Sequence, residues 1–280
     1  TRKESSAASD VYKRQIFNFA IEHLTSNNYL YMISSLKERR TIRKYLNKDI
    51  DEQLLNELLE TAFRAPTTQN MQVYSVVITR EQENKEKLAP AHFNQPTVTS
   101  APVVLTFCAD FNRFIKWCEQ NHAEPGYDNF QSFVTAAIDA LLVAQQFCTV
   151  AEISGLGCCY LGTTTYNAPQ IAEILRLPKF VIPITTLTVG YPADIPAQIE
   201  RLPIEAILHH EAYQDYTPKA IHRLYFEKEN LAENKKYIEE NHKENLAQVF
   251  TDVRSPRKDN ELFSKTFLDF IVKQGFRLPD

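Results

Sequence analysis

The stretch between residues 128 and 154 restricts most strongly what this chain can fold into. Its length suits one long helix, and apolar side chains such as Phe133, Ala140 and Phe147 cover most of its faces. A helix that packs on one side of a sheet needs only one apolar stripe. We therefore expect this helix to lie in the core and to be buried by more than its own sheet. A dimer interface would supply the second surface.

The segments around this helix predict few strands and much helix. Strands are expected at 73–79, 102–109 and 181–192, with a strand-like segment at 155–162. Further helices are expected at 51–64, 81–89, 169–175 and 263–276, whereas residues 110–127 are expected to be irregular. Because strands and helices do not alternate regularly, we expect an α+β fold in which helices flank the sheet, rather than a doubly wound dinucleotide-binding fold.

The two ends of the sequence differ in character. Residues 1–15 are polar and lack periodicity, so we interpret them as an extraneous leader, and residues 16–32 receive no role. Residues 33–280 suit one large domain with extensions. Within that domain, residues 205–250 are polar and charge-rich, which predicts an exposed helical excursion.

Charge and cysteine content exclude several classes of protein. The formal net charge is −4 and no basic stripe is present, which argues against a nucleic-acid-binding protein. No uninterrupted apolar run reaches the roughly 18 residues that span a bilayer, so no membrane association is expected. Five cysteines without a CxxC pair favour a reducing compartment, and we expect a cytoplasmic protein whose cysteines are small buried residues. No metal site is predicted, because the adjacent His209 and His210 cannot easily share one ion.

Two polar segments carry groups that could bind a ligand. Residues 39–43, RRTIR, gather three arginines and a threonine, and arginine forks match the geometry of phosphate oxygens. Taken alone, a solvated basic patch would look the same. Residues 65–72, APTTQNMQ, offer hydroxyl and amide groups that suit a heteroaromatic ring edge, although an ordinary loop has the same composition. Arg201 follows a strand and turn, where it could reach a phosphate or simply lie on the surface.

The glycines are concentrated in one part of the chain. Four of the six fall between residues 155 and 190. The segment GLGCCYLG at 155–162 could be mistaken for a dinucleotide-binding fingerprint, but its glycine spacing is wrong and it follows a helix instead of a strand. We reject that interpretation and assign Gly155 to the end of the long helix.

In their order and spacing, these segments resemble the nitroreductase family, and in particular its NADPH-dependent nitroreductase and flavin reductase subgroup. The resemblance spans roughly residues 33–280. It rests on RRTIRKY (39–45), APTTQNMQ (65–72), FCADFNR (107–113), GLGCCYLG (155–162), VGYPAD (189–194), RLP (201–203) and FLDFIVKQGF (267–276). It implies an antiparallel-type sheet flanked by helices in an intertwined homodimer, with FMN bound at the subunit interface.

The resemblance also implies which residues hold the flavin. Those at its phosphate and ribityl end would be Arg39, Arg40, Thr41 and Arg201. Those around its ring would be Arg43, Thr67, Asn70, Gln72, Gln95, Leu161, Gly162 and Thr163, with Thr67 and Gln72 in the same pocket and backbone N–H groups at 161–162 facing N5. A positive group near N1 stabilises an anionic reduced flavin, and Arg43 is expected to have that role. No catalytic nucleophile is needed, since the flavin carries the chemistry.

The implied activity is a ping-pong transfer of two electrons from NAD(P)H to nitroaromatics, quinones or free flavin. Alternatives remain open: a flavin reductase that supplies reduced FMN, or a flavin-binding sensor that does not turn over. The electron donor is also open between NADPH and NADH. Ile199 stands where the subgroup usually has a basic residue, and ENHKEN at 240–245 has no clear match to the arginines that some members use for NADPH. The physiological acceptor is not specified by the sequence.

Overall fold

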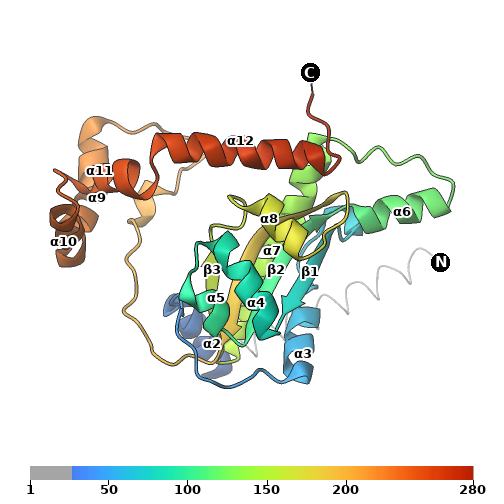
Figure 1. The fold of residues 1–280 in the computed structure, drawn as a ribbon. Coiled ribbons are helices and arrows are strands. Elements are labelled where there is room, and N and C mark those ends of the chain that lie inside the picture. The colour runs from blue at the N-terminus through green and yellow to red at the C-terminus, as the bar shows by residue number, and fades with distance from the viewer. Residues whose placement is uncertain (1–26, 280) are drawn as a thin grey trace, which may run out of the picture.

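A four-stranded antiparallel sheet forms the centre of the molecule (Figure 1). The computed structural model describes residues 27–279, with side chains from Met32 onward, so the leader predicted at 1–15 lies outside the described residues. The strands occur in the order β1-β2-β4-β3. Their bounds are Tyr74–Thr79 for β1, Val103–Asp110 for β2, Gly157–Leu161 for β3 and Val181–Gly190 for β4. The expected α+β class and the expected strands are confirmed.

The long helix α7, Phe130–Ile153, packs across one face of this sheet and buries ten of its residues. It begins at Asn129, whose side chain accepts a hydrogen bond from the backbone N–H of Ser132. It ends just before Gly155, which has a φ of +81° that favours glycine. By length and composition α7 could cross a membrane. However, Ala136, Ala140 and Phe147 are fully buried in the core, as in the central helix of a globular domain.

The same face of the sheet carries α3, Glu52–Ala62, which packs against α7 and begins as expected at Asp51. The Asp51 carboxylate accepts from the backbone N–H of Leu54. The opposite face is covered by short helices: α4 (Gln82–Leu88), α5 (Pro96–Ser100) and α8 (Ala168–Ile174) (Figure 1). Successive residues of a strand face opposite sides, so Cys158 of β3 packs on the α7 side and Cys159 on the other.

The prediction that residues 110–127 are irregular was wrong for its first half. Residues Asn112–Gln120 form helix α6, which buries Ile115 and Cys118 one turn apart. Pro125 and Gly126, which suggested an irregular segment, lie beyond the end of this helix. Four residues, 121–124, thus separate the end of the helix from Pro125, whereas helices often end within one to three residues of a proline.

The C-terminal part extends away from the sheet and then returns to it (Figure 1). It contains α9 (Pro218–Asn230), α10 (Ala232–Glu240), α11 (Leu246–Gln248) and α12 (Arg257–Lys273), with single turns at Ile204–Ala206 and Val249–Arg254. Helix α12 is attached to the body by Phe263, whose ring stacks on Tyr166 at a centroid distance of 4.5 Å. The segment leading to α9 exposes large apolar side chains: Ile195, Ile199, Ile204, Ile207, Leu208 and Tyr213.

A close approach at Gly157 determines how the arginine segment lies on the sheet. A Cβ atom at this position would lie 2.5 Å from Cβ of Ile42, which is buried. We therefore expect Gly157→Ala to destabilise the protein by about 1–3 kcal/mol, because Ile42 or the strand must move. Gly126→Ala is the matched control, since a Cβ there meets nothing within 4 Å. Urea unfolding of both variants checks this, and equal free energies of unfolding would contradict it.

Candidate functional site

Residues 39–43 run along β3, the edge strand of the sheet. The backbone N–H of Ile42 donates to the carbonyl of Cys158 (3.1 Å). The hydroxyl of Tyr45 contacts the Ile42 carbonyl (2.8 Å) and the Thr188 carbonyl (3.0 Å), which ties the end of the segment to β4. The arginines predicted to bind an anion are thus held on a fixed strand edge and not on a mobile surface loop.

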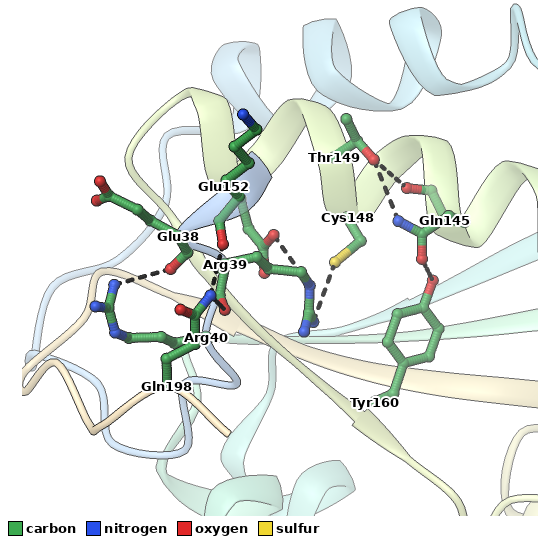
Figure 2. A network of polar contacts seen from close by, with 10 residues as sticks. Glu38, Arg39, Arg40, Gln145, Cys148, Thr149, Glu152, Tyr160 and Gln198 are labelled. Carbon is green, nitrogen blue, oxygen red and sulfur yellow. Dashed lines mark hydrogen bonds and ion pairs between the residues drawn. The ribbon is translucent and has the colours of Figure 1, made fainter. Parts of the chain in front are cut away.

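Arg39 pairs with two groups on the last turns of α7 (Figure 2). Its Nε lies 3.2 Å from the carboxylate of Glu152, and its guanidinium donates to Sγ of Cys148 at 3.8 Å. Burial alone would lower the pKa of Arg39, but the negative charges of Glu152 and Cys148 raise it overall. Arg39 therefore remains cationic while partly buried.

Arg40 lines a pocket beside Arg39, and the segment that precedes Arg201 is bonded to the backbone next to it. Arg40 donates to the carbonyl of Glu38 (2.8 Å), and its buried Nε has no hydrogen-bond partner among the described residues. The side chain of Gln198 donates to the carbonyls of Lys37 and Arg39, which holds the Arg201 segment against the arginine segment (Figure 2). Arg201 is exposed, and its guanidinium donates to the carbonyls of Ile199 and Glu200. A pocket of about 430 Å³ is lined by Arg39, Arg40 and Glu152.

Three of the predicted ring-edge residues, Leu161, Gly162 and Thr163, lie at the end of β3 and directly after it. The hydroxyl of Thr163 lies 2.8 Å from Nδ1 of His92. Gly162 has open space around it, since a Cβ there meets nothing within 4 Å. Arg43 is exposed beside Cys159, on the sheet face that carries α4, α5 and α8. Gln95 immediately precedes α5. These residues leave room at the exposed backbone of Gly162.

The loop at 67–72 is rigidly held although it has no regular structure beyond one turn. Gln69, Asn70 and Gln72 all have positive φ angles between 51° and 56°. Asp139, which is buried in α7, accepts from the backbone N–H (3.0 Å) and the hydroxyl (3.1 Å) of Thr68. Arg113 adds a hydrogen bond to the carbonyl of Gln72. The loop geometry is therefore imposed by contacts from α7 and α6.

Within one chain, the loop at 67–72 lies far from the other predicted site residues. It leads into β1, whereas Arg39–Arg43 and Leu161–Thr163 lie along and after β3, at the opposite edge of the sheet. The only charged residues in α7 are Asp139 and Glu152, and each holds one of the two groups. Glu152 is the thirteenth residue after Asp139, which is about 20 Å along the helix at 1.5 Å per residue.

Removing the Asp139 carboxylate tests the loop anchor. We expect Asp139→Ala to cost about 1–3 kcal/mol of stability, because the N–H of Thr68 loses its buried acceptor. The strained positive-φ residues that follow should then become mobile. Asp139→Asn is the matched control, because its side-chain oxygen can still accept from Thr68. Thermal unfolding and hydrogen exchange at 67–72 measure both effects. Equal protection of this loop in the two variants would contradict the assignment.

Several residues that shape the site were not predicted. Asp139, Glu152 and His92 position predicted residues, and so does Arg113. The sequence could have indicated Asp139, because it is the only charged residue between 129 and 151 in an apolar helix and a buried charge needs a partner. Arg113 and His92 gave no such signal, since their partners are distant in sequence.

Comparison with known proteins agrees with this geometry. Residues 36–191, more than half of the chain, match the nitroreductase family. An FMN reductase [NAD(P)H] from Bacillus subtilis (strain 168) is 35% identical over 184 residues, covering 65% of this chain and 74% of that protein. A Cr(VI) reductase from Pseudomonas sp. (strain G-1) is 28% identical over 246 residues, covering 86% and 97%. A crystal structure from Bacteroides fragilis NCTC 9343 is 62% identical, covers 87% of this chain and 99% of that one, and superposes with a TM-score of 0.86. The chain belongs to the nitroreductase family.

Proposed function

We propose that this protein is an FMN-dependent oxidoreductase that uses NAD(P)H. The observation that carries the proposal is the arginine segment held along β3 beside the open backbone of Gly162. Relatives named FMN reductase and Cr(VI) reductase support the reaction class. The sequence resemblance and the structural arrangement therefore converge on one cofactor.

The residues present fit FMN at its phosphate end. Arg39 is cationic and partly buried, and Arg40 carries a buried N–H that no described residue satisfies. Both line the same pocket, and the segment that carries Arg201 is bonded to the backbone beside them. A phosphate would supply acceptors for these donors. Arg39, Arg40, Thr41 and Arg201 are assigned to that end.

The ring end is assigned to the groups around the end of β3. FMN, when bound, accepts a hydride from the nicotinamide and delivers two electrons to the acceptor. Arg43 would supply positive charge close to the N1–O2 side and so favour the reduced anion. The backbone N–H groups of Leu161 and Gly162 would face N5, with Thr163 and Gln95 at the neighbouring edge. The open space at Gly162 supports this orientation.

A homodimer completes this site with the loop of the second subunit. In one chain the loop residues Thr67, Asn70 and Gln72 lie at the other edge of the sheet, about 20 Å away along α7. Helix α7 also leaves Ile138, Leu141 and Leu142 between 41% and 50% exposed, which are unusual values for a central apolar helix. A two-fold dimer buries this surface and brings each loop to the arginine segment of its partner.

The acceptors are flat, electron-poor aromatics or quinones, and free flavin is a further candidate. The helical excursion at 205–250, within a domain spanning 33–280, exposes apolar side chains such as Ile207, Leu208 and Phe226, and it would pack against the partner subunit and border this face. The sequence has no basic stripe of the kind that would indicate nucleic-acid binding. Helix α7 packs in the core, so we assign it no role in a membrane. The buried, unpaired cysteines support a cytoplasmic location. A non-enzymatic flavin sensor is less well supported, because the presence of Arg43 and the open space at Gly162 favour an enzyme.

Absorption spectroscopy of the purified protein tests the cofactor and the donor together. We expect a flavin spectrum that bleaches on addition of NADPH or NADH without oxygen and recovers on addition of a quinone. A colourless protein that cannot be reconstituted with FMN would refute the proposal. Bleaching without turnover would instead support the sensor.

Arg43→Ala is expected to weaken FMN binding and to slow turnover by roughly tenfold or more, because positive charge near N1 is lost. Arg43→Lys keeps the charge and is the matched control. Flavin content and steady-state rates measure both effects. Unaltered values in Arg43→Ala would exclude the assigned role.

A further inference from the structure

A cluster of ionisable groups lies where the end of α7 meets β3. Cys148 and Glu152 are one turn apart on α7, and Cys158 comes from β3. Their sulfur and carboxylate atoms all lie within 4.8 Å of one another. The guanidinium of Arg39 contacts both Cys148 and Glu152 (Figure 2). We call these four residues the thiol cluster.

The thiol cluster favours ionisation of one sulfur over the other. The neighbouring Cys158 thiol lowers the pKa of Cys148; burial opposes this, and the guanidinium of Arg39 adds to the lowering. The neighbouring Cys148, together with burial, raises the pKa of Cys158. Burial and the neighbouring Cys148 raise the pKa of Glu152, whose Oε1 is buried without a partner among the described residues. Of the two thiols, Cys148 is therefore the one that ionises more readily.

Other cysteines of the chain lack this environment. Burial raises the pKa of Cys108 and of Cys159, and neither is hydrogen-bonded to another thiol. A thiolate is the reactive form of cysteine, and nearby positive charge increases its population. Cys148 is thus set apart from Cys108 and Cys159 by its contacts, although all three are buried.

We propose that Cys148 and Cys158 form a redox-active dithiol that a peroxide oxidises to a disulfide. The Cys148 thiolate attacks one peroxide oxygen, the O–O bond breaks, and hydroxide leaves a sulfenic acid on Cys148. The sulfur of Cys158 then forms the S–S bond, the S–O bond breaks, and the hydroxyl leaves as water with the proton of Cys158. The dithiol loses two electrons, which reduce the peroxide. The proton that Cys148 released on ionising converts the first hydroxide to water.

Arg39 affects both the ionisation of Cys148 and the access of small molecules to it. The side chains of Arg39 and Glu152 are 27% and 12% exposed, and both line the pocket of about 430 Å³ in front of the thiols. A small oxidant therefore reaches Cys148 when these two side chains move. Two thiols and a carboxylate are also ligands that zinc accepts. The guanidinium of Arg39 already occupies the position that a metal cation would take between Cys148 and Glu152. This favours the redox-active dithiol over a zinc site.

Peptide mapping of the full-length protein, carried out with and without bound FMN, tests the proposal. After treatment with hydrogen peroxide and blocking of free thiols, we expect a peptide that links Cys148 to Cys158 and has lost two hydrogen atoms. The rate should reach half of its maximum at least one pH unit below the usual thiol pKa of about 8.5. Cys159→Ser is the matched control and should leave this rate unchanged, whereas Cys158→Ser should stop at a sulfenic acid on Cys148.

Three results would overturn the proposal. They are a linkage between other cysteines, oxidation of Cys148 no faster than that of Cys108, and stoichiometric zinc released when the cluster is unfolded. The pH profile is measured on the unaltered chain, so it does not depend on how well a variant folds. Disulfide formation is detected independently of flavin, so this test and the test of the proposed function can fail separately.

Discussion

Two variants that are each strongly impaired are expected to form a heterodimer with one intact site. Arg43→Ala damages the β3 edge of the sheet, and Gln72→Ala damages the loop before β1. If each flavin lies between the arginine segment of one subunit and the loop of the other, a heterodimer of these variants has one site with both substitutions and one site with neither. We expect such a heterodimer, isolated with two different affinity tags, to bind one FMN and to show about half of the wild-type rate.

The matched control carries both substitutions on one chain, paired with a wild-type chain. Each of its two sites then has one damaged side, so its activity is expected to stay near that of the single variants. If each chain formed a complete site alone, the outcome would reverse. The heterodimer of Arg43→Ala and Gln72→Ala would then stay as impaired as the single variants. The control heterodimer would keep half of the activity through its wild-type subunit. Flavin content and steady-state rate distinguish the two arrangements.

The sequence predicted the main elements because their signals are local. Apolar periodicity located α7 and α3, and short apolar runs located β1, β2 and β4. Gly155 correctly indicated the end of α7. Helix α6 was missed because it is only nine residues long and buries only Ile115 and Cys118, which is too short a pattern to outweigh the nearby Pro125 and Gly126.

The candidate site was predicted as segments but not as an arrangement. Motif spacing indicated residues 39–43 and 65–72, but it could not reveal that β1 and β3 are at opposite edges of the sheet. That separation depends on strand order, which is set by long-range pairing. The positions of Asp139 and Glu152 on one apolar helix carried part of this information. A carboxylate that is largely buried needs a polar partner. Asp139 has its partner in the loop at 67–72 and Glu152 has its partner in Arg39, so the two carboxylates contact the two separate parts of the predicted site.

His92 contacts the predicted site, although no local sequence pattern indicated it. Its burial leads to a specific prediction about how the stability of the protein depends on pH. Its ring is fully buried, its Nδ1 contacts the hydroxyl of Thr163, and its Nε2 has no partner among the described residues. Burial lowers the pKa of His92 to about 4. The unfolded chain, with a pKa of about 6.5, binds the proton more readily, so stability rises with pH between these two values and is lost as the pH falls through them.

We therefore expect the wild type to lose about 2 kcal/mol more stability than His92→Gln when the pH is lowered from about 7 to about 5. Glutamine retains a group that can bond to Thr163 but does not titrate, so the other acidic and basic groups cancel in the comparison. Denaturant unfolding at both pH values gives the difference. Parallel losses in the two proteins would show that His92 ionises normally. In that case Thr163 would not be held by a neutral imidazole, and the ring-edge geometry at the end of β3 would depend instead on the backbone of Leu161 and Gly162.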